Sequence, residues 1–349
     1  MQLTCDGCGR SFDVPAMPLH CWCGTTTPRP AATAKVPEAS PPRPMRFAAT
    51  TSRACPDIDQ VRLVTFHFNP CRFAALARTY QRWVPTLGPL ADALVCYEVV
   101  FDGDAPEIPG SIVIRARRDE CLMWQKESLI NRAVDETPDR CRYFAWIDHD
   151  LVFQDPDWLP QGVRRMRDVD AVACQLFGEI RFLGSDDRVL WRRRSAMTAW
   201  TKSRSIDGSP GGAWIADVQY LRDIGGLSDA SIVGGGDQVF LNAMSGAEPS
   251  HFPHVADGLR RAESRWLRRA VDVKGNRPAI SLCGVVFHLH HGDRKHRQYR
   301  DRNQLLIDHD YDPTTDVHRR PDGLLQWSSD KPGLHAAVAK YFADRREDG

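Results

Sequence analysis

Apolar and polar positions follow a regular alternation of strand and helix periods over most of this chain, beginning near Gln60. Residues 61–68 form an apolar-rich run that predicts a buried strand, and apolar side chains at helical spacing follow over 73–84. Later segments continue the alternation, with strands predicted over 93–101, 111–114, 143–147 and 170–177, and helices over 124–134 and from Asp155 onward. Strands that alternate with helices predict the α/β class, with a mostly parallel sheet and helices on both of its faces.

The first 26 residues lack this alternation and contain two close pairs of cysteines. The cysteines are Cys5, Cys8, Cys21 and Cys23. Paired cysteines at this spacing are typical of a tetrahedral zinc site, which a module too small for a hydrophobic core needs in order to fold. The second pair is closer than the usual spacing, so His20 could replace one thiolate. We therefore expect residues 1–26 to form a zinc-ribbon-like module with a structural Zn²⁺, able to dock to a protein partner.

Residues 27–58 are rich in proline, alanine, threonine and serine and have no apolar period. This composition predicts a flexible or semi-extended linker. The main domain is therefore expected over residues 59–345.

Charge and cysteine usage restrict the class of partner and the compartment. The formal net charge of +1 favours neither nucleic acid nor an acidic membrane as a partner. No apolar run approaches the ~20 residues that a membrane helix requires, and the chain does not open on a signal-peptide pattern. The cysteines beyond the first module are scattered singly, which is typical of reduced thiols. A cytoplasmic location is therefore expected.

Two aspartates, Asp148 and Asp150, directly follow the predicted strand over 143–147. Open α/β sheets bind their ligands outside the carboxyl ends of the strands, so both carboxylates are expected at the rim of the sheet. On an extended backbone they would lie on the same side and could share one Mg²⁺ or Mn²⁺. An isolated Asp-X-Asp is otherwise typical of a solvated surface turn, but the flanking apolar runs favour a metal site.

Three histidines follow another apolar strand, at His288, His290 and His291, and arginines come soon after them. A histidine cluster beside glycine and arginines indicates contact with a metal or with phosphate, and not core packing. Imidazole ligands added to two carboxylates shift the preferred ion from Mg²⁺ toward Mn²⁺.

Glycine-rich segments lie next to Trp214 and Asp237, and they predict turns with positive φ or a backbone that passes close to a ligand. Asp237 stands just before an apolar stretch, where the N-cap of a helix is expected. A carboxylate at the start of a helix can stay ionised and accept a proton from a hydroxyl. The sequence leaves open whether Asp237 is a cap alone or also a general base.

Taken in order, these motifs resemble those of glycosyltransferases with the GT-A fold. The motifs are Asn69-Pro70, Lys126-Glu127, Trp146-Ile147-Asp148-His149-Asp150, Gly211-Gly212-Ala213-Trp214, Gly234-Gly235-Gly236-Asp237 and His288-Leu289-His290-His291-Gly292. Over residues 60–305 the chain is similar to family 2 enzymes and to the C-terminal region of β-1,4-galactosyltransferases and polypeptide N-acetylgalactosaminyltransferases. The resemblance implies metal-dependent transfer of a hexose from a nucleotide diphosphate sugar, UDP-linked, to a hydroxyl of a glycan, lipid-linked or protein acceptor.

The resemblance also implies roles for individual residues. Asp237 would be the catalytic base of an inverting reaction. The ligands of Mn²⁺ (or Mg²⁺) would be Asp148, Asp150, His288 and His291. Contacts to the nucleotide sugar would come from Asn69, Lys126, Gly211, Gly212, Trp214, Gly236, Arg294 and Arg297. The family has a second carboxylate directly before the base, where this chain has Gly236, so the resemblance does not fix the donor.

Two other readings of the same residues are possible. A nucleotidyltransferase also uses a carboxylate-bound metal on an α/β sheet, but it needs a glycine-rich basic loop after the first strand, and residues 68–71 contain no glycine. A non-catalytic protein that binds a partner through its zinc module is the other alternative. The acidic and histidine motifs argue against it.

Overall fold

The computed structural model describes residues 2–4, 11–13, 50–247, 249, 254–298 and 301–348. The chain divides into two compact units, Met1–Arg43 and Pro44–Gly349. Of the smaller unit, the described part is an antiparallel pair of strands, β1 (Gln2–Thr4) and β2 (Ser11–Asp13). Cys5, Cys8, Cys21 and Cys23 lie outside the described residues. The structural zinc, and the docking of a protein partner to the module of residues 1–26, therefore stay predictions.

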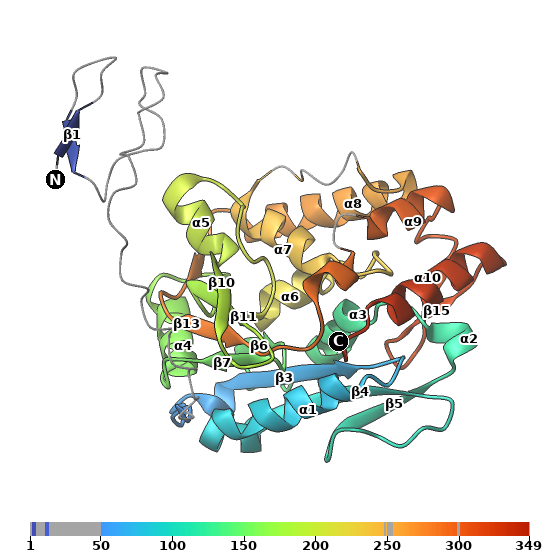
Figure 1. The fold of residues 1–349 in the computed structure, drawn as a ribbon, viewed down its shortest axis with the longest axis horizontal. Helices are drawn as coiled ribbons and strands as arrows, with labels where there is room; N and C mark the ends of the chain where they lie inside the picture. Colours follow the sequence, from blue (N-terminus) through green and yellow to red (C-terminus); the bar gives the residue numbers. More distant parts are fainter. Residues whose placement is uncertain are drawn as a thin grey trace, which may run out of the picture. The chain divides into compact units, whose positions relative to one another are not determined.

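A seven-stranded sheet forms the centre of the larger unit (Figure 1). Its strands, in spatial order, are β12 (Ala279–Ser281), β8 (Ala173–Gln175), β11 (Ala213–Asp217), β6 (Tyr143–Ile147), β3 (Val61–Phe68), β4 (Leu94–Phe101) and β5 (Ile112–Ala116). Strand β11 runs antiparallel to both of its neighbours, and the other neighbouring pairs are parallel. The expected α/β class with a mostly parallel sheet is confirmed.

Strand β6 shows why the sheet is buried on both faces. All five of its residues are buried, and successive side chains point to opposite faces of the sheet. Tyr143, Ala145 and Ile147 pack into one hydrophobic core, and Phe144 and Trp146 pack into a second one. A strand covered on both faces has a continuous apolar sequence, which is the pattern that predicted it.

Helices from different parts of the chain cover the two faces (Figure 1). The first core includes side chains of α1 (Ala74–Trp83) and α4 (Trp158–Asp168). The second core includes side chains of α3 (Lys126–Asp135), α5 (Ala196–Ser203), α6 (Val218–Ile224), α7 (Gly236–Ser245) and α8 (Asp257–Lys274). The predicted two-sided arrangement of helices is therefore present.

A smaller, four-stranded sheet brings distant segments of the chain together. Its strands, in spatial order, are β10 (Val189–Arg194), β9 (Glu179–Leu183), β13 (Val285–His288) and β7 (Leu151–Phe153). Strand β7 follows Asp150 directly, and β13 carries His288 at its end. The antiparallel pairing of β13 with β7, which sets His288 opposite Leu151, therefore places the histidine segment beside the aspartates.

A third core lies under the C-terminal elements. These are α9 (Arg302–Asp308), the hairpin of β14 (Val317–Arg319) and β15 (Leu325–Trp327), and α10 (Pro332–Asp344). The remaining short helices of the described residues are α2 (Arg118–Cys121), η1 (Ile58–Gln60), η2 (Val84–Ala93) and η4 (Arg294–Arg297).

The end of the segment expected to be a linker belongs to the folded domain. Ser52 and Cys55 are both buried. The Ser52 hydroxyl donates to the Thr86 carbonyl at 3.1 Å and accepts a hydrogen bond from the Trp158 indole at 2.9 Å. These buried anchors tie Ser52 and Cys55 to the larger unit, and the extent of the linker over residues 27–58 stays a prediction.

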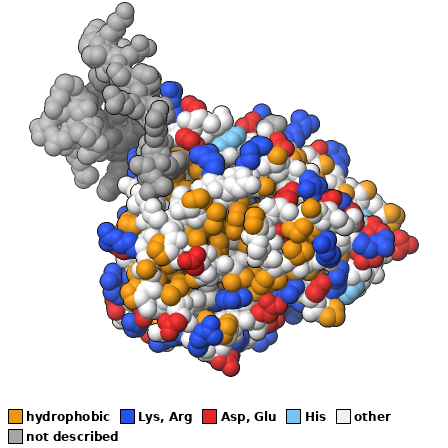
Figure 2. Space-filling view, turned by 90° about the horizontal axis from the view of Figure 1, so that it is seen from below, with side chains coloured by type: hydrophobic (Ala, Val, Ile, Leu, Met, Phe, Trp, Pro, Cys, Tyr) orange, Lys and Arg blue, Asp and Glu red, His pale blue; other side chains and the backbone are white. Residues whose placement is uncertain are grey.

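Charged side chains of both signs are interspersed over the face drawn in Figure 2, and hydrophobic side chains gather between them. This mixture agrees with the balanced charge of the sequence. None of the helices that the structure describes combines the length and the apolar composition that a membrane span requires.

Candidate active site

The two aspartates of the central motif lie in a turn between β6 and β7 and point to different partners. The Asp148 amide donates to the Gly212 carbonyl at 2.7 Å, and its carboxylate lies 2.7 Å from the Lys126 ammonium. The Asp150 carboxylate instead faces two histidines. The expectation that both carboxylates lie on one side of an extended strand is therefore wrong, because the backbone turns between them.

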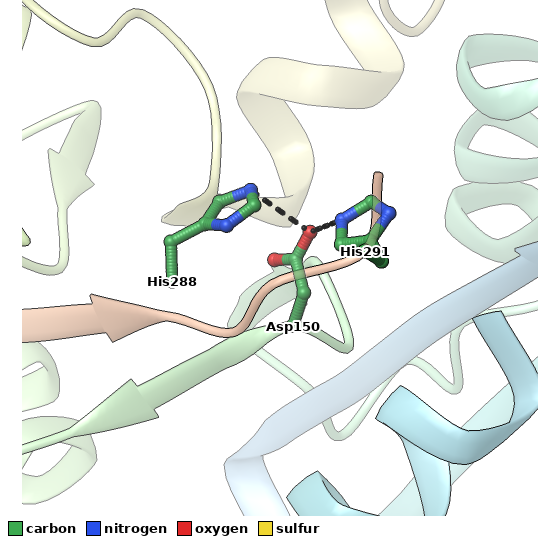
Figure 3. Close-up of side chains that lie close together, drawn as sticks. All are labelled: Asp150, His288 and His291. Carbon is green, nitrogen blue, oxygen red and sulfur yellow. Dashed lines mark hydrogen bonds and ion pairs between the residues drawn. The ribbon is translucent and has the colours of Figure 1, made fainter. Parts of the chain in front are cut away.

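Asp150, His288 and His291 form the group that we name the Asp–His cluster (Figure 3). Asp150 Oδ2 lies 2.9 Å from His291 Nε2 and 3.3 Å from His288 Nε2. One ligand atom from each residue lies within 4.8 Å of the other two. Asp150 Oδ1 is buried and has no hydrogen-bond partner among the described residues. A divalent cation would satisfy that buried oxygen.

The electrostatics of the Asp–His cluster suit a metal ion. Burial, only partly opposed by Asp150, lowers the pKa of His288 to about 4. Burial alone would raise the pKa of Asp150, but the neighbouring histidines hold it well below its usual range. At neutral pH the cluster therefore offers a neutral imidazole at His288 and an ionised carboxylate at Asp150, the forms that bind metals. Burial and the charge of Arg297 would lower the pKa of His291, but its hydrogen bonds to Asp150 and Glu347 outweigh them and raise it, so a cation must displace a proton there at lower pH. This mixed nitrogen and oxygen donor set fits Mn²⁺ better than Mg²⁺.

A buried glutamate behind the cluster was not anticipated from the sequence. Glu347 Oε2 lies 2.8 Å from His291 Nδ1, and the glutamate side chain is 2% exposed. Burial would raise the pKa of Glu347, but the hydrogen bond from His291 and the charges of Arg297 and Arg345 lower it to about 2. Nothing in the sequence marks this residue, because it follows α10 in a polar segment far from every motif.

Lys126, at the start of α3, connects two of the expected functional carboxylates. Its ammonium lies 2.7 Å from Asp148 Oδ1 and 3.3 Å from Asp237 Oδ2. Burial would lower the pKa of Lys126, but these carboxylates raise it above its usual range. Burial also raises the pKa of Asp148 to about 6, although Lys126 opposes the shift. Lys126 therefore stays charged and holds Asp148 and Asp237 on either side of itself.

Asp237 is not the N-cap of its helix, as its position before an apolar stretch had suggested. Gly235, with φ of 120°, occupies the cap position, and α7 begins at Gly236. Asp237 lies in the first turn, where a negative charge interacts favourably with the helix dipole. Its carboxylate therefore points to Lys126 and is not used to cap the helix.

The glycines around Asp237 make room for side chains of the site. A Cβ atom at Gly211 would lie 2.3 Å from Asp237 Oδ2. At Gly236 it would lie 2.4 Å from Cγ of Glu127, which is buried. The Glu127 carboxyl thus fills the space next to the residue before Asp237, where the resembled family has its second carboxylate. Of the two expectations for these glycines, turns with positive φ are present at Gly212, Gly234 and Gly235. The groups that come close to Gly211 and Gly236 are the protein's own side chains.

Glu127 is held as a buried, partly protonated acid. Burial, and next to it the charge of Asp237, raise the pKa of Glu127 to about 8, while Lys126 opposes the shift. The nearby negative charge of Asp237 opposes ionisation of Glu127, so Glu127 keeps its proton to a higher pH than an exposed glutamate does.

Several expected substrate contacts are placed differently. Trp214 is fully buried, packs against Trp146 and Phe240, and donates its indole N–H to the Pro210 carbonyl at 2.9 Å. The Asn69 amide donates to the Phe73 carbonyl at 3.0 Å and to Glu107 at 2.8 Å, so it stabilises the loop after β3. Arg294 begins η4, and its side chain lies outside the described residues.

A cavity of about 870 Å³ joins the remaining groups. The expected site residues that line it are Asn69, Lys126, Asp148, Asp150, Gly211, Gly212, Asp237, His288, His291 and Arg297. One wall comes from the β9–β10 hairpin, which the sequence did not predict. There Trp191 stacks on Phe182 at 3.7 Å between ring centroids, and Phe182 lies 5.0 Å from the His288 ring. The cluster, the candidate base and an aromatic wall therefore face one space.

Among the comparisons with known proteins, only the one with solved structures found similar chains. No family model and no curated protein matches the chain. The catalytic domain of Drosophila β1,4-galactosyltransferase 7, complexed with xylobiose, aligns at 12% identity and a TM-score of 0.36, covering 79% of this chain and 98% of that one.

Two further solved structures align at similar or lower scores. A mannosyltransferase from Pyrobaculum calidifontis, in complex with GDP-Man and Mn²⁺, gives 13% identity and a TM-score of 0.38, over 82% of this chain and 73% of that one. A Bacillus anthracis structure described as a glucose-1-phosphate thymidylyltransferase gives 9% identity and a TM-score of 0.28, over 65% and 88%. At TM-scores and identities this low, the similarity assigns no function to this chain.

Proposed function

We propose that this chain is a metal-dependent glycosyltransferase of the GT-A fold, transferring a hexose from a nucleotide diphosphate sugar to an acceptor hydroxyl. The observation that supports this most is that the Asp–His cluster and Asp237 line one cavity. At about 870 Å³ the cavity is in the range of small-molecule sites, roughly 300–1,000 Å³. UDP-hexoses are the donors that we propose to test first, because the resembled enzymes use them.

Asp150, His288 and His291 would hold Mn²⁺ at the diphosphate of the donor. When bound, the cation would offset the negative charge that grows on the departing nucleoside diphosphate. Asp148, tied to Lys126, would lie at the nucleotide side of the cluster. Lys126 and Arg297 place positive charge on the cavity wall, where it favours phosphate binding.

Asp237 would act as the general base. It would take the proton of the acceptor hydroxyl while that oxygen forms its bond to the anomeric carbon and the bond to the diphosphate breaks. Attack from the face opposite the leaving group inverts the anomeric configuration. Lys126, 3.3 Å away, keeps the Asp237 carboxylate in place over Gly211.

Product analysis with Mn²⁺ tests the proposed reaction and its alternatives. The chain would be incubated with UDP-hexoses or GDP-mannose and a mixture of glycan acceptors, with and without Mn²⁺. We expect metal-dependent release of the nucleoside diphosphate together with a glycosylated acceptor. Release of pyrophosphate from a nucleoside triphosphate and a sugar phosphate would favour the nucleotidyltransferase. No turnover with any donor would favour the non-catalytic alternative.

Asp237→Asn tests the base. We expect transfer to fall by about 10²–10⁴-fold, the usual contribution of a general base, with Mn²⁺ affinity unchanged because the cluster keeps its ligands. Asp257→Asn is the control, since the Asp257 side chain is 72% exposed and forms an ion pair with Arg260 on the surface of α8. Near-normal transfer by Asp237→Asn would remove the residue from this role.

A further inference from the structure

The carboxylate of Glu347 contacts the imidazole of His291 on the side away from Asp150. His291 Nδ1 lies 2.8 Å from Glu347 Oε2, and His291 Nε2 lies 2.9 Å from Asp150 Oδ2. The other oxygen of Glu347 accepts a hydrogen bond from Arg345 Nε at 2.7 Å. With its own carboxylate fixed in this way, Glu347 meets His291 in one orientation.

We propose that Glu347 is a positioning residue of the metal site, which accepts the Nδ1–H of His291 and so presents the Nε2 lone pair to the cation. This inference rests on the proposed metal site. Histidines that bind metals commonly donate their second ring N–H to a carboxylate, which fixes the tautomer and the ring orientation and raises the basicity of the ligand nitrogen. Neutral histidine has one donor and one acceptor nitrogen, so the partner of Nδ1 decides what Nε2 can do.

Contacts of the neighbouring backbone hold Glu347 beside His291. Gly292, the residue after His291, has φ of +80°, and a Cβ atom on it would lie 2.8 Å from both Arg346 O and Glu347 Cα. The next residue, Asp348, accepts hydrogen bonds from the Ala74 and Ala75 amides, at 3.1 and 2.6 Å, at the start of α1. Residues 345–348 are thus held on both sides of Glu347, against the histidine loop and against α1.

A purely electrostatic role is the competing explanation. Glu347 lies 3.5 Å from Arg297, and that guanidinium lies 2.9 Å from His291 Nε2. Glu347 would then offset the positive charges of Arg297 and Arg345 without orienting the His291 ring. Glutamine separates these roles, because its amide oxygen can accept the Nδ1–H but carries no charge.

The experiment titrates Mn²⁺ into the full-length wild type and into Glu347→Ala and Glu347→Gln, with calorimetry or Mn²⁺ electron paramagnetic resonance. We expect Glu347→Ala to bind Mn²⁺ about 10–100-fold more weakly, the usual effect of losing such a partner. Glu347→Gln should recover most of that loss. Nitrogen NMR of metal-free protein, at a pH where His291 is neutral, should show a larger share of the Nδ1-protonated ring in the wild type and in Glu347→Gln than in Glu347→Ala, where Asp150 still accepts from Nε2 but Nδ1 has lost its carboxylate.

Asp348→Asn and Asp150→Asn are the matched controls. Asp348→Asn keeps one acceptor oxygen for the shorter hydrogen bond, from the Ala75 amide, and does not touch His291, so it should leave Mn²⁺ affinity unchanged. Asp150→Asn should abolish binding. If Asp150→Asn loses Mn²⁺ but Glu347→Ala binds like the wild type, the positioning role is wrong and the proposed function stands. Equal losses in the two Glu347 variants, with no change of tautomer, would show the electrostatic role instead. A wild type that binds no Mn²⁺ would overturn both proposals.

Discussion

At the scale of single residues, the candidate site consists of charged side chains that line the cavity and of buried groups that hold these side chains in place. Lys126 is charged and fixes Asp148 and Asp237, while Glu127 fills the space beside Gly236. Each of these contacts depends on a glycine or a neighbouring charge, so single substitutions report on them directly.

Gly236→Ala is expected to destabilise the fold. The new methyl group would lie within 2.5 Å of the carboxyl end of Glu127, which is buried and cannot move into solvent. Overpacking of this type usually costs about 1–3 kcal/mol. Urea denaturation would measure the change in the free energy of unfolding. Gly284→Ala is the control, because its Cβ would meet nothing within 4 Å and its φ is not positive. Equal unfolding midpoints for the two variants would contradict the close contact.

Glu127 is expected to make stability depend on pH. Its pKa, raised by burial to about 8, exceeds the value of 4.5 in the unfolded chain. The folded state therefore binds more protons between these values, so this contribution is complete below pH 4.5 and is lost as the pH rises through about 8. Urea denaturation from pH 5 to 9 should show the wild type losing stability relative to Glu127→Gln. A constant difference between the two would mean that Glu127 titrates normally.

At the scale of elements, the four-stranded sheet creates the candidate metal site. Strand β7 follows the aspartate turn, β13 carries His288, and their pairing places Asp150 beside both histidines. The residues that meet are 141 positions apart in the case of Asp150 and His291. A bound cation would link two strands that come from distant parts of the chain.

Mn²⁺ is therefore expected to stabilise the folded chain. A ligand that binds the native state alone, at about 100 times its dissociation constant, adds about 2.7 kcal/mol to the free energy of unfolding. Thermal denaturation with increasing Mn²⁺ should show the midpoint rising for the wild type. The midpoints of Asp150→Asn and His288→Ala should not respond to Mn²⁺. A response that survives in Asp150→Asn would place the ion elsewhere.

At the scale of the whole molecule, all three hydrophobic cores described above belong to the larger unit. Each of the three clusters is built from residues beyond position 50. Because its central strands are covered on both faces by helices from the whole length of this unit, we expect the unit to fold as a domain on its own.

Removal of residues 1–43 should therefore leave a folded protein. We expect the shortened chain, 44–349, to unfold cooperatively with a melting midpoint close to that of the full-length chain. It should also keep its Mn²⁺ response, since every member of the Asp–His cluster belongs to this unit. Calorimetry of both chains would check this. A large loss of cooperativity would mean that the first residues contribute to the domain.

The strands of the larger unit that the sequence predicted best were those with strong local patterns. The strands at 61–68 and 143–147 appear with the expected bounds, because 143–147 is fully buried and continuously apolar and 61–68 is mostly buried and rich in apolar residues. The β9–β10 hairpin was missed because its burial alternates and β10 is largely exposed, and the antiparallel direction of β11 leaves no mark on its own residues. The direction of a strand and its neighbours in the sheet are fixed by the connecting loops and by packing.

By itself, the sequence predicted the α/β class, the position of the aspartates after a central strand, and the grouping of Asp150 with His288 and His291, whose role as metal ligands stays a proposal. These follow from hydrophobic period and residue type, which are local properties. The tertiary structure decided that Asp148 pairs with Lys126, that Trp214 is a core residue, and that Glu127 and Glu347 support the site. The direction of a side chain within a turn, and contacts between residues that are distant in the sequence, depend on packing that no local pattern records.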